Sequence, residues 1–408
     1  MNSNGQKRGS AGETILWMII TAATVFVVTS FQHTKMTLGN EEYVATEARF
    51  KKLEKVLSVL DDEFLFEYDE AKLEEAAIKG MLEGLEEPYT SYFNVDETEE
   101  FLTETEGEYE GVGMYLSVDT IKNLPIVLMP IKNSPADEAG ILAGDYILEI
   151  DGKDVTAASI EEVAASVKGL ANSQVTIKFR RYTSEIEYTE FEKILTRRKV
   201  ELYPFEYKVM NDNIAYIKFE SFDEKAADNF TKAFKEMSKT NEIKGLIIDV
   251  RNNPGGLLTT AAEIIDSLLP TSVITYTVDK KGEKEYLYSD SKAINIPIVV
   301  ITNENSASAS EIMAAAIQDS ANGCTVGTTT YGKGLVQKFK SLGDGTYIKL
   351  TIAEYFSPSG NKINEIGVIP NYEVLDNTET KADEQLEKAL EVIANMIWHW
   401  YITMINWI

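Results

Sequence analysis

Apolar residues follow three different spacing patterns along the chain, and these patterns divide it into regions. Between residues 41 and 87 they recur every three or four positions, as they do on amphipathic helices. Residues 108–195 hold short β-rich runs separated by turns, with one helix expected from Ile160 to Val167. From Ile214 onward, strand-like runs alternate with helical segments. This alternation predicts βαβ crossovers on a largely parallel sheet, and therefore the α/β fold class.

Both ends of the chain carry uncharged segments. Thr14 to Thr34 holds no charged residue and follows Lys7 and Arg8, and 21 residues span the roughly 30 Å hydrocarbon core of a bilayer. We expect an uncleaved membrane anchor, with residues 1–13 in the cytoplasm and the remaining chain extracytoplasmic. A cleaved signal peptide is the competing interpretation. The Trp-rich residues 397–408 are too short to span a membrane, and either a membrane interface or packing on the folded body suits them.

Composition removes several classes of function. The net charge of −27 argues against nucleic-acid binding, which needs clustered Lys and Arg. The two histidines, His33 and His399, lie near the two ends of the chain, which argues against a Ser-His-Asp triad and against histidine metal sites. We therefore expect no metal and no cofactor. The single cysteine, Cys324, lies in a strand-like run and is expected to be a core residue.

Residues 133–152 form a Pro-bounded turn, a short helix, a Gly-Asp turn and a strand, and they resemble the second half of a PDZ domain. Upstream, Gly111, Val112, Gly113 and Met114 resemble the loop that receives a peptide C-terminus in PDZ domains. Successive N–H groups in such a loop attract a carboxylate, and the adjoining strand edge accepts an extended peptide. A small β-domain without a ligand is the alternative.

A serine cluster precedes the helix expected near residues 308–320. Ser308 and Glu311 match a helix capping box, so this cluster is by itself an ordinary helix start. The same position suits a nucleophile, because the helix N-terminus supplies free N–H donors for an oxyanion. Residue spacing does not choose among Ser306, Ser308 and Ser310.

Lys333 lies in a glycine-rich turn that nearly matches a nucleotide-binding P-loop. Gly334 stands where that loop needs Ser or Thr, so we favour a role for Lys333 as the base of a Ser-Lys pair. A lysine base must be neutral, and the ordinary lysine pKa is about 10.4, so we expect burial among apolar groups with no carboxylate nearby. Gln337 lies on the same face if a strand begins here, and it is suited to orient the amine.

Residues 249–258, DVRNNPGGLL, read as a strand end followed by a turn and a helix. The amide of Gly255 or Gly256 is a candidate to complete an oxyanion hole with that of Ala309. An ordinary βα turn explains the motif equally well.

Together these motifs resemble the carboxy-terminal processing, or tail-specific, protease family over roughly residues 40–396. The resemblance rests on DxRxNPGG, SASASE and GKGxVQ in that order. It implies Ser308 as nucleophile, Lys333 as base, Gln337 as the residue that orients it, and a crotonase-type ββα core. It also implies endoproteolysis at or near substrate C-termini, with the PDZ domain binding that end and regulating activity.

The expected domains are a helical region at 35–95, a PDZ domain at 96–195 and a protease core with a C-terminal helix at 196–396. Expected partners are proteins with exposed C-termini, the membrane, and a second copy paired through the N-terminal helices. Two rival functions stay open, namely a membrane-tethered PDZ scaffold with an inactive core and a helix-mediated oligomeric scaffold.

Overall fold

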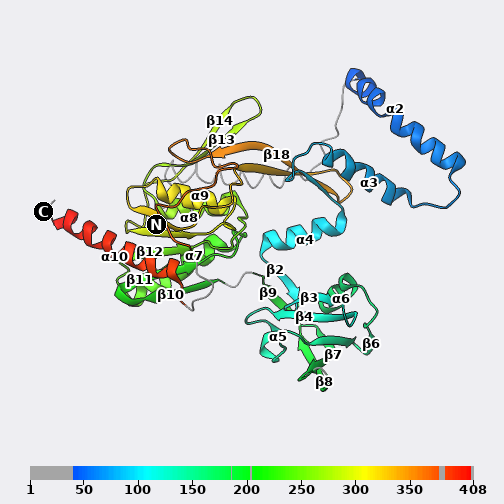
Figure 1. Cartoon of the computed structure of the whole chain (residues 1–408), viewed down its shortest axis with the longest axis horizontal. Helices are drawn as coiled ribbons and strands as arrows, with labels where there is room; N and C mark the ends of the chain where they lie inside the picture. The colour runs from blue at the N-terminus through cyan, green and yellow to red at the C-terminus, as the bar shows by residue number, and fades with distance from the viewer. Residues whose placement is uncertain (1–39, 185, 203–204, 376–381, 406–408) are drawn as a thin grey trace, which may run out of the picture. The chain divides into compact units, whose positions relative to one another are not determined.

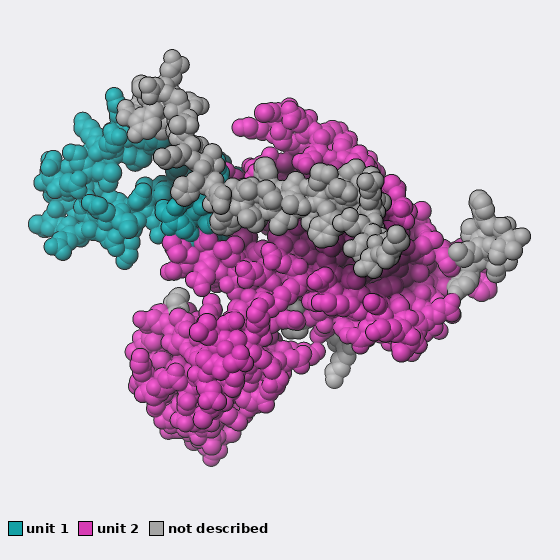
Figure 2. All heavy atoms as spheres, turned by 180° about the vertical axis from the view of Figure 1, so that it is seen from behind, with its two compact units in different colours: residues 1–94, 339–348 teal, residues 95–338, 349–408 magenta. Residues whose placement is uncertain are grey.

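A computed structural model describes residues 40–184, 186–202, 205–375 and 382–405. The expected anchor at 14–34 and His33 lie outside these ranges. The chain forms two compact units, Met1–Asn94 with Phe339–Ile348 and Val95–Lys338 with Lys349–Ile408, which are coloured in Figure 2. No helix within the described ranges is long and apolar enough to cross a membrane.

The N-terminal segment of the first unit is largely helical, as predicted. Its elements are α2 (Asn40–Glu63), α3 (Glu70–Glu83) and β1 (Ser91–Phe93). The Asp69 carboxylate begins α3 by accepting hydrogen bonds from the N–H groups of Ala71 and Lys72. The apolar residues of α2 that suggested a helix are largely exposed, including Phe50, Leu53 and Leu57.

The second unit begins with the predicted PDZ-like region (Figure 1). Its main sheet has the strand order β3-β4-β5-β7-β8, with β6 paired to β5, and a separate pair joins β2 to β9. Val127, Ile147, Ile177 and Phe179 are fully buried between the sheet and the predicted helix α6. The element bounds are α4 (Val95–Glu106), β2 (Glu108–Gly111), β3 (Met114–Asp119), β4 (Leu124–Pro130), α5 (Pro135–Glu138), β5 (Tyr146–Ile150), β6 (Lys153–Asp154), α6 (Ile160–Val167), β7 (Gln174–Tyr182), β8 (Tyr188–Thr196) and β9 (Arg198–Glu201).

The sheet of the following region has the order β10-β11-β12-β15-β16-β19. All neighbours in it are parallel except β10 and β11, which confirms the largely parallel sheet. The strand bounds are β10 (Glu206–Met210), β11 (Ile214–Lys218), β12 (Gly245–Asp249), β15 (Ile298–Thr302), β16 (Gly323–Gly327) and β19 (Tyr372–Glu373).

Alternate residues of these strands enter two separate cores. Ile217, Ile248 and Val300 pack with α7 (Ala226–Thr240), α8 (Leu258–Leu268) and α9 (Ala309–Gln318). Ile247 and Val299 face the other way and pack with α10 (Glu384–Ile405). Helices therefore cover both faces, as a parallel sheet requires.

A second, antiparallel sheet was not anticipated as a separate layer. In it β13 (Val273–Asp279) pairs with β14 (Lys284–Tyr288) on one side and with β18 (Tyr347–Phe356) on the other, and β17 (Leu335–Ser341) pairs with β18. The rings of Tyr286, Tyr276 and Phe356 stack across three strands, with neighbouring centroids 5.0 and 5.1 Å apart. These cross-strand stacks stabilise the sheet, whose strands carry polar residues between the aromatic ones.

The C-terminal boundary also differs from expectation. Residues 397–405 are not a separate tail, because α10 continues to Ile405. Val392 and Ile393 are buried against the parallel sheet, whereas Trp398 is 66% exposed. The helix continues because apolar residues recur at helical spacing, and burial of the face that they form stabilises the helix along its length.

Candidate functional site

Three motif loops meet at one edge of the parallel sheet. DVRNNPGG follows β12, the serine cluster follows β15, and the glycine-rich lysine turn follows β16. These three strands are adjacent and parallel, so their carboxyl ends lie at the same edge, where ligand sites of open α/β sheets form.

Buried amide and hydroxyl groups join the first two loops. The Asn253 carbonyl accepts hydrogen bonds from Ala307 N–H and Ser310 Oγ, both at 3.0 Å. Ser306 Oγ donates to the Val250 carbonyl at 2.8 Å. The side chains of Ser306 and Ser310 are fully buried, so their hydroxyls have structural partners.

Ser308 differs from both neighbouring serines. It is half-buried rather than buried, and it stands immediately before α9 with φ 56° and ψ −116°. A left-handed φ is rare for a residue with a Cβ and has to be held by its surroundings. The structure thus separates Ser308 from Ser306 and Ser310, which the sequence did not.

The fully buried Glu311 carboxylate links Ser308 to the lysine turn. It accepts hydrogen bonds from Ser308 N–H at 2.8 Å, Thr330 Oγ1 at 2.6 Å, Gly332 N–H at 2.7 Å and Lys333 N–H at 2.8 Å. Burial raises the pKa of Glu311, and these hydrogen bonds oppose the rise. The capping-box interpretation found the bond to Ser308 but not the three others.

Lys333 is half-buried, and its backbone N–H bonds to a buried carboxylate. A carboxylate thus lies beside the Lys333 backbone, and the expectation that the amine is buried among apolar groups stays a prediction. The carboxylate is needed because the turn presents several N–H groups that would otherwise be buried without acceptors. The Tyr355 hydroxyl forms a second link, since it contacts the backbone carbonyls of both Ser308 and Lys333.

Gln337 lies in β17, whereas Lys333 precedes that strand, which begins at Leu335. Strand alternation therefore does not relate the directions of the two side chains, contrary to our expectation. The side-chain amide of Gln337 donates to the Leu335 carbonyl at 3.2 Å and to Thr351 Oγ1 at 3.4 Å.

The three expected oxyanion donors differ in whether their amides are already hydrogen-bonded. The Gly255 amide donates to Asn253 Oδ1 at 2.8 Å. Within the described part of the chain, the amides of Gly256 and Ala309 have no acceptor. Gly255 is nonetheless adjacent to the serine loop, because a Cβ placed on it would lie 2.8 Å from the Ser308 Cβ.

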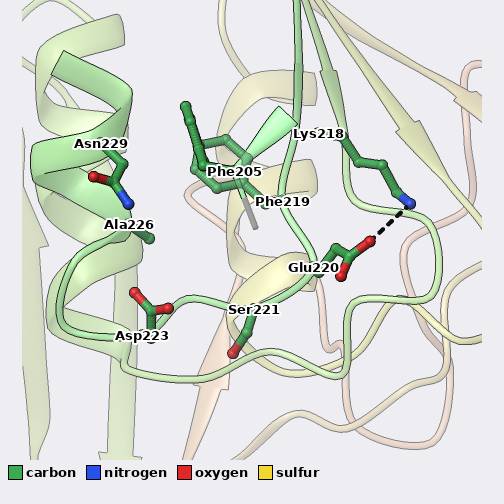
Figure 3. A pocket seen from close by; sticks show the side chains of 8 residues that line it. All are labelled: Phe205, Lys218, Phe219, Glu220, Ser221, Asp223, Ala226 and Asn229. Atoms are coloured by element: carbon green, nitrogen blue, oxygen red, sulfur yellow. Dashed lines mark hydrogen bonds and ion pairs between the residues drawn. The ribbon is translucent and has the colours of Figure 1, made fainter. Parts of the chain in front are cut away.

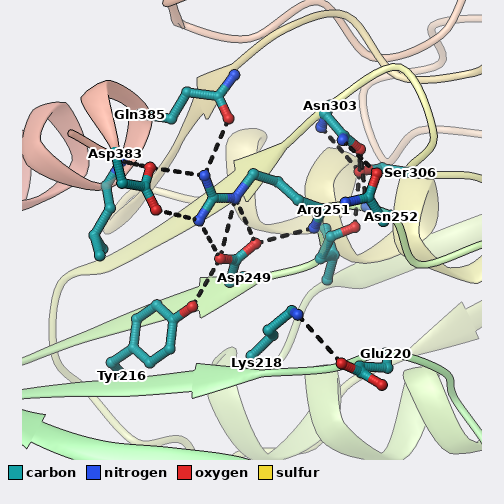
Figure 4. A network of polar contacts seen from close by, with 12 residues as sticks. Tyr216, Lys218, Glu220, Asp249, Arg251, Asn252, Asn303, Ser306, Asp383 and Gln385 are labelled. Atoms are coloured by element: carbon teal, nitrogen blue, oxygen red, sulfur yellow. Dashed lines mark hydrogen bonds and ion pairs between the residues drawn. The ribbon is translucent and has the colours of Figure 1, made fainter. Parts of the chain in front are cut away.

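An arginine network supports the first loop and was missed by the sequence analysis (Figure 4). Arg251 donates to the Asp249 carboxylate at 2.6 Å and to both oxygens of Asp383 at 2.8 and 2.9 Å. Tyr216 also donates to Asp249, at 2.8 Å. Asp383 precedes α10 and accepts the Leu386 N–H, so Arg251 connects the loop after β12 to the start of α10. Arg251 belongs to the DxRxNPGG motif. Its partner Asp383 lies 132 positions away, and no local sequence pattern indicates that the two residues pair.

The predicted PDZ loop joins β2 to β3, with Val112 and Met114 buried. The carbonyls of Val112 and Gly113 accept hydrogen bonds from Ala136 and Ile131 N–H, which hold the loop against α5. Burial raises the pKa of Tyr109, and hydrogen bonds from the backbone of Met114 and Gly113 oppose the rise. The Tyr109 hydroxyl therefore faces the backbone that we expected to receive a carboxylate.

A small hollow at the end of β11 is a separate feature (Figure 3). Lys218 pairs with Glu220 at 3.2 Å, and Asp223 accepts the Lys225 N–H at the start of α7. These groups are satisfied structurally and include no nucleophile paired with a base. The lining residues are Phe205, Lys218, Phe219, Glu220, Ser221, Asp223, Ala226 and Asn229.

The remaining reactive residues have structural surroundings. Cys324 is buried beside Met396, and burial raises the pKa of its thiol to about 11, which fits the predicted core role. His399 lies in α10, where its ring contacts the Asn395 carbonyl. The described residues contain no cluster of His, Cys, Asp and Glu able to hold a metal ion.

Comparison with known families matches three stretches of the chain. Residues 213–374 match peptidase family S41, residues 126–181 match the PDZ domain, and residues 18–98 match the N-terminal domain of the activating protease CtpB. The class of protein is thus a serine protease with a PDZ domain.

Individual relatives define the family. The chain is 32% identical over 349 residues to the carboxy-terminal processing protease CtpB of Bacillus subtilis, covering 84% of this chain and 72% of that protein. It is 34% identical over 331 residues to a carboxyl-terminal-processing protease of Synechocystis sp., covering 78% and 76%. A solved photosystem II D1 C-terminal processing protease shares 27% identity at a TM-score of 0.47, covering 83% and 91%. The chain belongs to the carboxy-terminal processing protease family.

The Arg251 network predicts a pH-dependent contribution to stability. Burial alone would raise the pKa of Asp383, but hydrogen bonds from Arg251 and Leu386 N–H hold it below its ordinary value. A lowered carboxyl pKa stabilises the fold above the unfolded pKa of about 3.9 and ceases to do so as pH falls through the folded value. Asp383→Asn should therefore lower the melting temperature at pH 6–8, and the difference should shrink below about pH 4.

The control is Glu391→Gln on the exposed side of the same helix, where Glu391 pairs with Lys388 at 2.8 Å. It should change the melting temperature little at any pH. A difference for Asp383→Asn that stays constant through the acid range would contradict the linkage.

Proposed function

We propose that this chain is a serine endopeptidase that processes proteins at or near their C-termini with a Ser308–Lys333 pair. The observation that carries the proposal is the shared Glu311 carboxylate, which accepts the backbone N–H groups of both Ser308 and Lys333 at 2.8 Å. The half-buried Ser308, flanked by two serines with structural partners, supports it as the nucleophile. Family membership supports the reaction class.

In the proposed mechanism, the neutral amine of Lys333 takes the Ser308 hydroxyl proton as Oγ attacks the scissile carbonyl. The N–H groups of Gly256 and Ala309 stabilise the resulting oxyanion. Collapse breaks the peptide bond, and Lys333 returns the proton to the leaving amine. Water then hydrolyses the acyl-enzyme with the same lysine as base, which releases the acid product and restores the serine. Gln337 orients Lys333 in this proposal, and the core is of crotonase type.

We further propose that the PDZ domain binds the substrate C-terminus through the loop 111–114 and regulates cleavage. Support comes from the loop position between β2 and β3 and from the matched PDZ region. The alternative of an inactive scaffold is less favoured, because the named relatives are processing proteases.

The N-terminal proposals are membrane attachment through 14–34 and pairing of two chains through α2. The uncharged segment supports the first, and the exposed apolar stripe containing Leu53 and Leu57 supports the second.

The nucleophile and base are tested by Ser308→Ala and Lys333→Ala. Each variant should fold and lose casein cleavage by at least about 10³-fold, because both groups act in one chemical step. Ser308→Ala should also lose labelling by a fluorophosphonate. Ser238→Ala and Lys362→Ala, both on exposed surface, serve as controls and should keep normal rates. Normal activity in either dyad variant would refute the assignment.

Recognition of the C-terminus is tested by peptide binding to the full chain carrying Ser308→Ala. A peptide with a free C-terminal carboxylate should bind about 10- to 100-fold more tightly than its amidated form, since hydrogen bonds to charged groups contribute about 1.5–3 kcal/mol. Acetylating the N-terminus of the same peptide should have no effect. Equal binding of the free and amidated peptides would exclude carboxylate recognition.

The N-terminal region is tested in the full chain by two double variants. Ile20→Lys with Val25→Lys should release the protein from membranes in carbonate extraction, because each lysine costs about 3 kcal/mol at a helix centre. Leu53→Glu with Leu57→Glu should halve the mass measured by sedimentation in detergent. Retention on membranes or an unchanged mass would reject the corresponding proposal.

A further inference from the structure

Tyr355, near the end of β18, joins the two backbone segments that carry the proposed dyad. Its side chain is 1% exposed. Its hydroxyl donates to the Ser308 carbonyl at 3.1 Å and contacts the Lys333 carbonyl as well. This tyrosine therefore lies between the serine loop and the lysine turn.

Strand alternation explains how Tyr355 reaches this position. Neighbouring side chains of β18 point to opposite faces, so Phe356 enters the aromatic row with Tyr276 while Tyr355 enters the core beside α9. The Tyr355 N–H also donates to the Gly334 carbonyl at 2.9 Å. Two successive carbonyls of the lysine turn, at residues 333 and 334, are therefore held by one tyrosine.

The Tyr355 hydroxyl is shared between the serine loop and the lysine turn. The Ser308 carbonyl also accepts the N–H groups of Glu311 at 2.9 Å and Ile312 at 3.1 Å. A phenol has one hydrogen, so it serves one carbonyl at a time or is shared by both. Loss of the hydroxyl therefore changes the contacts of both backbone segments.

We propose that Tyr355 is a positioning residue that sets the distance between Ser308 and Lys333, an inference that rests on the proposed dyad. Glu311 holds the N–H side of both residues, and Tyr355 holds their C=O side. Fixing both ends of the Lys333 backbone fixes the direction in which its side chain leaves the chain. Such orientation matters because a misplacement of about 1 Å can cost about 10²-fold in rate.

The test is Tyr355→Phe, which removes one oxygen and keeps the ring. We expect kcat on a peptide substrate to fall about 10- to 100-fold with KM unchanged, since Tyr355 acts on the dyad and not on substrate binding. The acid limb of the kcat/KM profile should move to higher pH, because an amine free to turn toward water keeps its proton more readily.

The matched control is Thr275→Val on the neighbouring strand. The Thr275 hydroxyl is equally buried and donates to the Phe356 carbonyl at 2.7 Å, one residue beyond Tyr355. Thr275→Val should lower the melting temperature to a similar extent yet leave kcat and the pH profile unchanged. A purely structural role for Tyr355 predicts that both variants behave alike.

Replacement of Tyr355 by 4-aminophenylalanine provides a rescue variant that keeps a donor in the same place. It should recover part of the kcat lost in Tyr355→Phe, and it remains informative if the phenylalanine variant does not fold. Equal rates for the parent and Tyr355→Phe, or equally slow phenylalanine and aminophenylalanine variants, would overturn the positioning role. Ser308→Ala run in parallel separates the cases, since activity in that variant overturns the dyad itself.

Discussion

The candidate site depends on one buried carboxylate. Glu311 lies in the first turn of α9 and accepts four hydrogen bonds, three of them from backbone N–H groups on both loops. A buried carboxylate is costly unless its acceptor capacity is filled, and a turn rich in buried N–H groups is costly unless it finds acceptors. The carboxylate and the N–H groups therefore each remove the free-energy cost of burying the other. As a result, the serine loop and the lysine turn are stable only next to each other.

The parallel sheet makes that meeting unavoidable. Strands β12, β15 and β16 are neighbours, so the loops after them start side by side, although the ends of β12 and β16, at Asp249 and Gly327, are 78 positions apart in the sequence. Asn253 and Ser306 then join the first two loops, and Glu311 joins the second to the third. Arg251 secures the first loop from outside by pairing with Asp249 and Asp383. The antiparallel sheet adds Tyr355 from the remaining side.

Local sequence patterns predicted the helices and strands. The residues that these patterns missed are held by long-range contacts. The periodicity of residues 226–237 and 258–269 identified α7 and α8, and the run from 245 to 250 identified β12, because these signals lie within a few neighbouring residues. Family spacing was needed to choose Ser308. Tyr355 and Asp383 were not found, since their partners lie 47 and 132 positions away. The continuation of α10 past Ile397 was also missed, because uncharged residues suit a helix and a separate tail equally.

The backbone of Ser308 shows how these contacts act together. Its left-handed φ of 56° is unfavourable for a residue with a side chain, yet both of its backbone groups are held, the N–H by Glu311 and the C=O by Tyr355 and α9. Gly255 completes the arrangement. It adopts φ 111°, and any Cβ there would approach the Ala307 carbonyl and the Ser308 Cβ to 2.8 Å. Only a residue without a side chain lets the two loops approach this closely beside the strained backbone of Ser308.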